Sequence, residues 1–280
     1  MRLRPISNRV NTSEQIFSVK NKIILITGGA GFLGMRYVEF LATAGAKVAI
    51  IDALGQPKLE QKVHALPLRL RKNIDVYSQD ITDQEGVRKV IAAVLKRWGR
   101  IDALVNNAAL TYSPAKKESA EQFSPYEEYP LDLWKAAVDT GLTGTFIVTQ
   151  VIIRVMKKQR SGVIVNIGSV YGEVAHDSQI YPVGRFGSIA YAVTKGALPN
   201  FTRELASYLA RFGVRVNTLT LGGVENAQDP LFVKKYSERT MLGRMGEKDD
   251  YNGAILFLLS DASRYMTGAN LIVDGGWTAW

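Results

Sequence analysis

The sequence contains no cysteine. This absence excludes disulfide bonds and thiolate chemistry, and it is compatible with a reducing compartment. Long apolar runs are also missing, because the longest ones, Ile23 to Ile26 and Val48 to Ile51, have the length of buried strands and are too short to cross a bilayer. The first residues carry arginines with no apolar stretch behind them, which argues against a secretory signal. We therefore expect a soluble, cytoplasmic protein without membrane contact.

The 280 residues, of which 46% are hydrophobic and 22% charged, suffice for one large globular domain with a full core. Nearly half of the net charge of +9 lies in residues 1–22, which hold five basic side chains and one acidic one. The other basic residues are scattered, and no aromatic pattern or nucleic-acid motif accompanies them. We therefore expect a basic tail over residues 1–20, a single domain over 21–280 and no nucleic-acid partner.

Short β-branched runs alternate with helical patterns along the chain. The strands are predicted over 22–27, 47–51, 74–77, 102–105, 162–168, 214–219 and 270–273. Helices are predicted up to about residue 44 and over 82–98, 131–156, 188–212 and 249–260, with Thr82 and Glu85 forming a capping box and Pro199 bending the fourth. This alternation predicts an α/β fold with a doubly wound parallel sheet of about seven strands, the Rossmann fold, with one crevice at the strands' carboxyl ends.

Four segments lack a clear period. Residues 55–72 are predicted to be a loop with about one helical turn, and residues near 111–130, 170–187 and 222–247 are predicted to be loops on the substrate side. Loops of this length inside a compact domain are functional or partly disordered.

A glycine-rich run follows the first predicted strand and precedes a helix. Its spacing fits the dinucleotide fingerprint, in which missing side chains let the backbone and the helix N-terminus approach a pyrophosphate. The alternative is a turn-forming glycine cluster without a ligand. The predicted cofactor contacts in this run are Gly28, Gly29, Gly31, Phe32, Leu33 and Gly34.

Asp52 stands at the end of the second predicted strand. A carboxylate there accepts hydrogen bonds from both ribose hydroxyls and repels a 2′-phosphate. The next residues are Ala53 and Leu54, so no arginine is present to bind such a phosphate. The pattern favours NAD as the cofactor, and NADP stays open as the alternative.

Small and polar residues follow the other predicted strands. The hydroxyl of Ser169, directly after the fifth strand, suits a hydrogen bond to a substrate oxygen, although serines in this position are more often part of a turn. Small and amide side chains after the fourth strand suit a ligand that lies against the backbone. The further predicted cofactor contacts are Asp80, Ile81, Asn107, Ala108, Ala109, Tyr191, Lys195, Gly222 and Val224.

Tyr191 and Lys195 are four residues apart at the start of a helical pattern, so they share one helix face. A phenol titrates near a pKa of about 10, and a cation close to it favours the phenolate, so such a tyrosine can transfer a proton at working pH. The spacing alone is also compatible with an ordinary half-buried tyrosine. Tyr112 and Lys116 repeat it, but Pro114 between them argues against a helix there.

Taken in order, these motifs resemble the short-chain dehydrogenase/reductase family over about residues 20 to 280, and the chain closes with Ile-Val-Asp-Gly-Gly at 272–276, as many members do. The resemblance implies that Tyr191 is the acid/base and that Lys195 holds the nicotinamide ribose and lowers the pKa of the tyrosine. It implies that Ser169 orients the substrate oxygen while hydride passes between the substrate carbon and the nicotinamide. No metal site is predicted.

The sequence departs from the family pattern in four places. Gly31 is followed by Phe32, a spacing more typical of the family's extended members, and Gly141 stands where many members have an asparagine that supports a water-mediated proton relay. Leu221-Gly222 replaces a Pro-Gly pair, and 22 residues separate Ser169 from Tyr191 (191 − 169), which indicates a substrate-side insertion.

These features are similar to those of dehydrogenases of bacterial surface-sugar and flagellin-glycan biosynthesis, which implies a phosphorylated or nucleotide-linked sugar as substrate. The basic candidates for such a substrate are Lys116, Lys117, Arg185 and Arg244. The leading hypothesis is an NAD-linked oxidoreductase that interconverts a secondary alcohol and a ketone, on a carbohydrate. The alternatives are a dinucleotide-binding regulatory or scaffold protein without turnover, and an epimerase or dehydratase that uses the nicotinamide transiently. The resemblance also implies a homodimer or homotetramer paired through the helices near 131–156 and 188–212.

Overall fold

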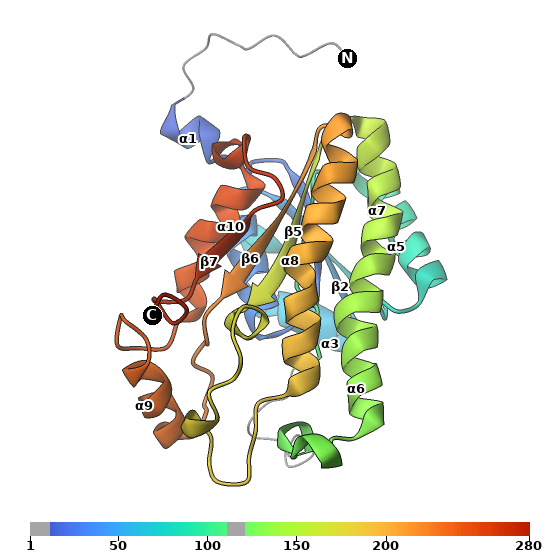
Figure 1. Ribbon diagram of the computed structural model, residues 1–280. Coiled ribbons are helices and arrows are strands. Elements are labelled where there is room, and N and C mark those ends of the chain that lie inside the picture. The colour runs from blue at the N-terminus through green and yellow to red at the C-terminus, as the bar shows by residue number, and fades with distance from the viewer. Residues whose placement is uncertain (1–11, 111–120) are drawn as a thin grey trace.

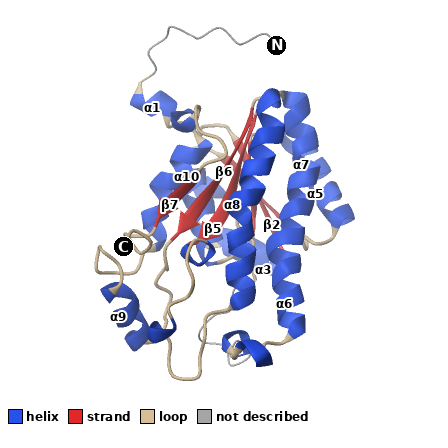
Figure 2. Cartoon of the chain, viewed as in Figure 1, coloured by secondary structure: helices blue, strands red, loops and turns tan. Residues whose placement is uncertain are grey.

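The computed structural model of the protein describes residues 12–110 and 121–280. One parallel sheet in the order β3-β2-β1-β4-β5-β6-β7 forms its centre (Figures 1 and 2). The order reverses between β1 and β4, which is the switch point where ligands bind in such folds. The predicted seven-stranded Rossmann fold is therefore confirmed. The strands are β1 (Ile23–Thr27), β2 (Lys47–Asp52), β3 (Ile74–Ser78), β4 (Ala103–Asn106), β5 (Gly162–Ser169), β6 (Val214–Leu221) and β7 (Asn270–Val273).

Helices cover both faces of the sheet because β1, β2 and β4 are buried and mainly apolar on both sides. On one face, buried side chains of β1 and β2 pack with α2 (Phe32–Thr43), α3 (Gln56–His64), α4 (Leu68–Arg71) and α10 (Asn252–Leu259). On the other face, they pack with α5 (Gln84–Trp98), α7 (Thr145–Gln159) and α8 (Ile189–Leu209). A third and smaller apolar cluster lies beyond the carboxyl ends of the strands, on the substrate side.

The helix predicted over 131–156 is longer than expected and is not uniform. α6 (Leu131–Val138) passes into a π-helical segment, η3 (Asp139–Gly144), and then into α7. By length and composition, the whole stretch Leu131–Gln159 could cross a membrane. It packs instead against α5 and α8 (Figure 1), as the core helix of a globular domain does. π-helical segments are frequent at functional sites, and this one lies beside α8.

Two segments predicted as loops contain helices. Residues 55–72 form α3 and α4, because Pro57 occupies the first turn of α3, where its missing amide is tolerated. Within 222–247 the structure has α9 (Pro230–Glu238), capped by Asp229 and again with a proline in the first turn. The predicted capping box of Thr82 and Glu85 is also wrong. Asp83 is the N-cap and accepts hydrogen bonds from the amides of residues 85 and 86.

The described part of the predicted tail, residues 12–20, contains the short helix α1 (Ser13–Ile16), which a Thr12–Gln15 capping box begins. Val19 is buried in the core, and the ring of Phe17 lies 6.5 Å from that of Phe257 on α10. This segment therefore packs on the domain. Residues 1–11, which carry three of the arginines, lie outside the described residues.

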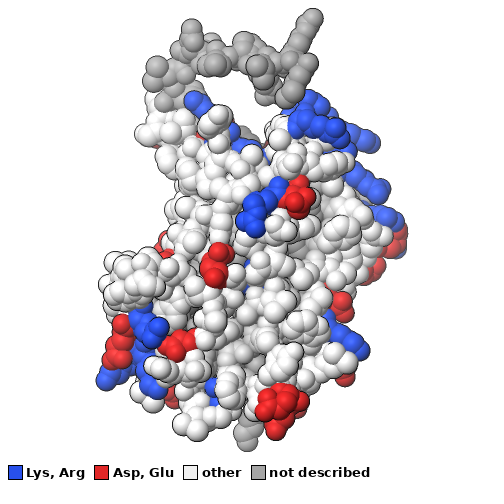
Figure 3. All heavy atoms as spheres, viewed as in Figure 1, with Lys and Arg blue, Asp and Glu red and all other residues white. Residues whose placement is uncertain are grey.

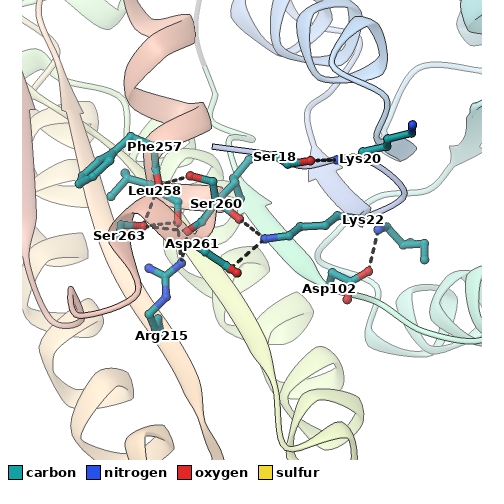
Figure 4. A network of polar contacts seen from close by, with 12 residues as sticks. Ser18, Lys20, Lys22, Asp102, Arg215, Phe257, Leu258, Ser260, Asp261 and Ser263 are labelled. Atoms are coloured by element: carbon teal, nitrogen blue, oxygen red, sulfur yellow. Dashed lines mark hydrogen bonds and ion pairs between the residues drawn. The ribbon is translucent and has the colours of Figure 1, made fainter. Parts of the chain in front are cut away.

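A polar network fixes the C-terminus of α10 at the edge of the sheet away from the crevice (Figure 4). The Lys22 ammonium donates to the Leu259 carbonyl at 3.0 Å. The Arg215 guanidinium donates to the carbonyls of Leu258 and Ser260 at 3.0 and 3.1 Å. These bonds satisfy carbonyls that the end of a helix leaves without intrahelical partners. They hold α10 against the sheet.

The positive charge is unevenly distributed. On the face shown in Figure 3, Lys and Arg gather near the upper ends of α7 and α8, where Lys157, Lys158 and Arg211 lie, whereas both signs mix lower down. The basic end therefore lies away from the strands' carboxyl edge.

Candidate active site

The glycine turn after β1 brings β1, α2 and the end of β4 into close contact at the switch point. Gly28 has a φ of +61°, and a Cβ atom there would lie 2.8 Å from the Ala108 Cα. A Cβ atom at Gly34 would overlap the Gly28 carbonyl oxygen and would lie 2.8 Å from the Gly29 Cα. Only glycine permits these approaches. The turn therefore places the first turn of α2 at the crevice.

The first amides of α2 point toward the same place. Its N-cap is Gly31, and no side chain among the described residues caps the helix. The amides of Phe32, Leu33 and Gly34 are therefore the first of the helix, and such amides, together with the helix dipole, attract an anionic pyrophosphate. The structure thus brings the predicted glycine-run contacts together in an arrangement that fits a dinucleotide.

Asp52 lies beside this turn, at the end of β2. One carboxylate oxygen accepts the Ala30 amide at 3.0 Å, and the other accepts the Leu54 amide at 3.1 Å. These bonds fix the orientation of the carboxylate, and each oxygen retains a lone pair for a further donor. The arrangement fits two vicinal ribose hydroxyls.

Asn107 braces the crevice from the side of β4. Its side-chain amide donates to the carbonyls of Thr27 and Gly28 at 3.1 and 3.0 Å. The Thr27 hydroxyl in turn accepts the backbone amides of Asn107 and Ala108, both at 3.1 Å. The side chain predicted to contact the cofactor thus joins β1 to β4, and Ala108 and Ala109 follow it along the crevice.

Asp80 and Ile81 have local roles in the structure. The Asp80 carboxylate accepts the amide and the hydroxyl of Thr82, both at 2.8 Å. Ile81 is buried, and its Cδ1 lies 2.6 Å from the position that a Cβ atom at Gly144 would take. Ile81 therefore packs against the π-helical segment, and a cofactor contact from this pair stays a prediction.

Ser169 and Tyr191 meet beyond the carboxyl end of β5, although they are 22 positions apart in the sequence (191 − 169). Ser169 ends β5, and Tyr191 lies in the first turn of α8, where its amide donates to the N-cap Ser188 at 3.5 Å. Burial raises the pKa of Tyr191, and the Ser169 hydroxyl opposes this rise because a donor beside the phenol stabilises the phenolate.

Lys195 lies on the same face of α8, as the spacing predicts. Its ammonium is 5.6 Å from the centroid of the Tyr191 ring and donates to the Ile167 carbonyl at 2.6 Å. Burial lowers the pKa of Lys195 to about 8. The expected lowering of the tyrosine pKa by this lysine is not found in this structure. Burial dominates at Tyr191, and the ammonium is directed at the Ile167 carbonyl.

Gly141 occupies the family's asparagine position within the π-helical segment. A Cβ atom there would lie 3.1 Å from the Cβ and 3.3 Å from the hydroxyl of Thr194 on α8. The Thr194 hydroxyl donates to the Tyr191 carbonyl at 2.8 Å. Thr194 thus takes up the space that a longer side chain at 141 would need, which is a packing reason for the glycine.

Sequence reasoning missed a buried amide network that joins the strands of the site to its helices. The Asn106 side chain donates to the Thr149 hydroxyl at 3.0 Å and to the Asn166 carbonyl oxygen at 2.8 Å, and Asn166 donates to the Thr202 hydroxyl at 2.8 Å. The network fixes α8, which carries Tyr191, against β5. Its signal in the sequence is an asparagine inside an apolar strand, Val-Ile-Val-Asn-Ile.

An aromatic wall covers the substrate side. Tyr171 and His176 stack with their centroids 3.8 Å apart, and His176 meets the edge of Tyr181 at 6.0 Å. Phe232 of α9 and Phe123 lie 5.5 and 6.3 Å from Tyr181. The insertion before Tyr191 therefore folds into an aromatic layer with α9.

The stacked His176 makes stability pH-dependent. Burial lowers its pKa to about 4, from an ordinary value of about 6.5, so the unfolded chain binds more protons between these pH values. Its contribution to stability is complete above about pH 6.5 and falls with pH, by about 2 kcal/mol at pH 5 and about 3 kcal/mol at pH 4.

Urea unfolding of the wild type and of His176→Gln at pH 7 and pH 5 measures this contribution. The wild type is expected to lose about 2 kcal/mol more than the variant over this interval. His64→Gln is the matched control, because His64 is exposed on α3. This variant is expected to lose as much stability between pH 7 and pH 5 as the wild type. Equal losses in the wild type and His176→Gln would contradict the assignment.

The remaining predicted residues divide between the crevice rim and the surface. The amide of Gly222 donates to the Val273 carbonyl at 2.9 Å, and Val224 pairs with Gly246, so the turn after β6 is fixed to the core. Arg244 forms a two-pronged ion pair with Asp250. The basic candidates Lys116 and Lys117 lie outside the described residues, and the Arg185 guanidinium lies 5.1 Å from the Phe123 ring.

Metal ligands do not gather in the described ranges. Within residues 12–110 and 121–280, no three side chains of His, Asp or Glu are close enough to hold a metal ion.

The comparisons with known proteins agree with this geometry. A family model described as "Enoyl-(Acyl carrier protein) reductase" matches residues 30–278. Sorbose reductase of Candida albicans is 31% identical over 94% of this chain and 89% of its own length.

Two solved structures are similar in both fold and sequence. Gluconate 5-dehydrogenase of Burkholderia cenocepacia, in complex with NADP and tartrate, has a TM-score of 0.82 at 31% identity over 96% of this chain and all of its own. A short-chain dehydrogenase of Leptospira borgpetersenii with bound NAD+ has a TM-score of 0.82 at 30% identity over 99% of this chain and all of its own. Together with the family model, these matches show that the chain belongs to the short-chain dehydrogenase/reductase family, whose members oxidise alcohols or reduce ketones with a nicotinamide dinucleotide.

Proposed function

We propose that this protein is an NAD-dependent oxidoreductase that interconverts a secondary alcohol and a ketone on a polyol or sugar-type substrate. The observation that carries the proposal is the meeting of Ser169, Tyr191 and Lys195 at the carboxyl end of β5, beside the glycine turn. The bound dinucleotide would supply or accept the hydride. The first turn of α2, Asp52 and the residues after β4 and β6 would hold it.

Tyr191 is assigned the proton transfer. When an alcohol is oxidised, the phenolate of Tyr191 takes the hydroxyl proton, and in the reverse reaction the phenol returns it to the forming alkoxide. Ser169, whose hydroxyl opposes the rise in the pKa of this phenol, orients the substrate oxygen and stabilises the phenolate. Lys195 holds a positive charge 5.6 Å from the ring, where it suits a bond to the cofactor ribose.

Two observations support a carbohydrate substrate. The aromatic wall of Tyr171, His176 and Tyr181 combines flat rings with polar atoms, a combination that packs against the C–H faces of a sugar and bonds to its hydroxyls. Sorbose reductase and gluconate 5-dehydrogenase, whose names denote sugar-derived substrates, are among the similar proteins.

A substrate screen tests the function. Purified protein is incubated with polyols, sugar acids, sugar phosphates and nucleotide-linked sugars, each with NAD and with NADP, and the absorbance of the reduced cofactor is followed. We expect net NADH formation with at least one polyhydroxy substrate. Turnover confined to simple cyclic alcohols would reject the carbohydrate class, and cofactor binding without turnover of any alcohol or ketone would reject the enzyme.

We also propose that the protein is a cytoplasmic homo-oligomer that pairs through α7 and α8. Phe146 on α7 and Val193 and Tyr208 on α8 expose 45–50% of their surfaces although they are large and apolar. Light scattering is expected to give the mass of a dimer or tetramer. Phe146→Glu should shift that mass toward the monomer, because a charge would be buried at the contact. A wild-type monomer would contradict the proposal.

A further inference from the structure

The substrate side is built from two segments that bind one another. α9 and the insertion at 170–187 lie side by side beyond the carboxyl ends of β5 and β6 (Figure 1). Arg239 pairs with Asp177 at 3.0 Å, and Lys235 donates to the Gln179 carbonyl at 2.9 Å. With the contact between Phe232 and the insertion, these bonds make one unit, which we call the lid, consisting of residues 170–187 and 229–240.

Tyr236 is the buried anchor of this lid. It is 1% exposed, and its ring stacks on Trp277 with the centroids 4.0 Å apart and the planes at 14°. Its hydroxyl accepts the Gly223 amide at 2.6 Å. A Cβ atom at Gly223 would lie 2.6 Å from the ring carbon that bears this hydroxyl, so the residue must be glycine for the contact to form.

The turn at 222–224 is held independently from the side of the core. The Gly223 carbonyl accepts the Gly246 amide at 2.8 Å, and the Tyr251 hydroxyl donates to the Gly222 carbonyl at 3.2 Å. The turn therefore keeps a fixed partner on one side and meets the lid through Tyr236 on the other. A ligand that contacts this turn therefore contacts the segment to which the anchor of α9 is bonded.

We propose that Tyr236 is a positioning residue that couples the turn at 222–224 to the lid, so that binding of the dinucleotide orders the substrate side. This inference rests on the proposed function, because it takes Gly222 and Val224 as cofactor contacts. The Tyr236 hydroxyl links the Gly223 amide to α9, on which Tyr236 lies. The Arg239–Asp177 pair then links this part of the lid to the insertion. The lid then forms the substrate wall most firmly when the cofactor is bound.

Hydrogen exchange followed by mass spectrometry tests the coupling on the whole protein, with saturating NADH and in parallel with NADPH as probes. Three forms are compared, namely the wild type, Tyr236→Phe and Tyr251→Phe. The first variant keeps the ring stacked on Trp277 and removes only the hydroxyl. The second is the matched control, because it removes a buried tyrosine hydroxyl bond to the same turn from the side of the core. The segment at 28–34 reports cofactor binding in every form.

In the wild type, the dinucleotide is expected to slow exchange at 28–34 and also in the lid. In Tyr236→Phe, the slowing at 28–34 is expected to persist, whereas the slowing in the lid falls about fivefold, the factor that one net hydrogen bond contributes. Tyr251→Phe is expected to keep the response of the lid. For any substrate that is turned over, Tyr236→Phe should lower kcat/KM mainly by raising KM.

Three results would overturn the coupling. The first is that the dinucleotide slows hydrogen exchange in the lid equally in the wild type and in Tyr236→Phe. The second is that both variants lose this slowing alike. The third is that, in the wild type, the dinucleotide slows exchange at 28–34 but not in the lid. The absence of slowing at 28–34 in the wild type with both dinucleotides would instead reject the proposed function itself, and the coupling with it.

Discussion

Tyr191→Phe is expected to reduce kcat by about a thousandfold, within the range that a positioned acid/base contributes. The substitution removes the only atom of the side chain that can exchange a proton and keeps the ring packed at the start of α8. Binding of the dinucleotide should change little, since the substitution leaves the proposed contacts at the glycine turn, at Asp52, after β4 and β6 and at Lys195 in place. Steady-state kinetics on an accepted substrate, with NADH titration by fluorescence, measures the two effects separately.

Tyr208→Phe is the control for this variant, because it removes the same atom from an exposed position further along α8. It should retain wild-type kcat. An unchanged kcat in Tyr191→Phe would show that the phenol takes no part in the proton transfer. A companion variant, Ser169→Ala, should move the acid-side limb of the oxidation profile, where activity rises as Tyr191 loses its proton, to higher pH, because losing the hydroxyl that stabilises the phenolate raises the pKa of Tyr191 further.

The fold was accessible from the sequence because its strongest signals are local. β1, β2 and β5 are short apolar runs. β1 is followed by a glycine, β2 ends in an acid and β5 ends in a hydroxyl residue, and the alternation with helices leaves few possible topologies. Residues 55–72 and 222–247 are predicted as loops, the first with about one helical turn, because they show no clear helical period. In α3 and α9 the proline occupies the first turn, where no amide is needed, so it starts the helix.

The site was only partly accessible, since its electrostatics depend on contacts between distant segments. The spacing of Tyr191 and Lys195 places them on one face. Whether burial or charge dominates the phenol's pKa depends on the Ile167 carbonyl, 28 residues earlier in the chain, which binds the ammonium. The reason for Gly141 is likewise the side chain of Thr194 on another helix. Neither contact leaves a periodic signal.

The substitution of Asp52 is expected to change cofactor preference more than any other single change. In Asp52→Asn the carboxylate becomes an amide with one acceptor oxygen, so one of the two backbone donors, Ala30 or Leu54, must face an NH2 group. The fixed orientation is lost together with the charge. NADH affinity should fall about tenfold to a hundredfold, the range for a charge-assisted hydrogen bond.

NADPH affinity should move in the opposite direction, because Asp52 no longer opposes the 2′-phosphate with a like charge. The double variant Asp52→Asn with Ala53→Arg adds a cation at an exposed position directly beside it, so the preference for NADH over NADPH should fall by about a hundredfold or more in total. Fluorescence titration of both reduced cofactors gives the ratio for each protein, and Asp80→Asn, at the end of the neighbouring strand, controls for the loss of a carboxylate elsewhere in the crevice. If the wild type binds NADPH as tightly as NADH, or if the ratio is the same in all proteins, then Asp52 does not select the cofactor. The NAD assignment would then fail while the fold and the Ser169–Tyr191–Lys195 arrangement stand.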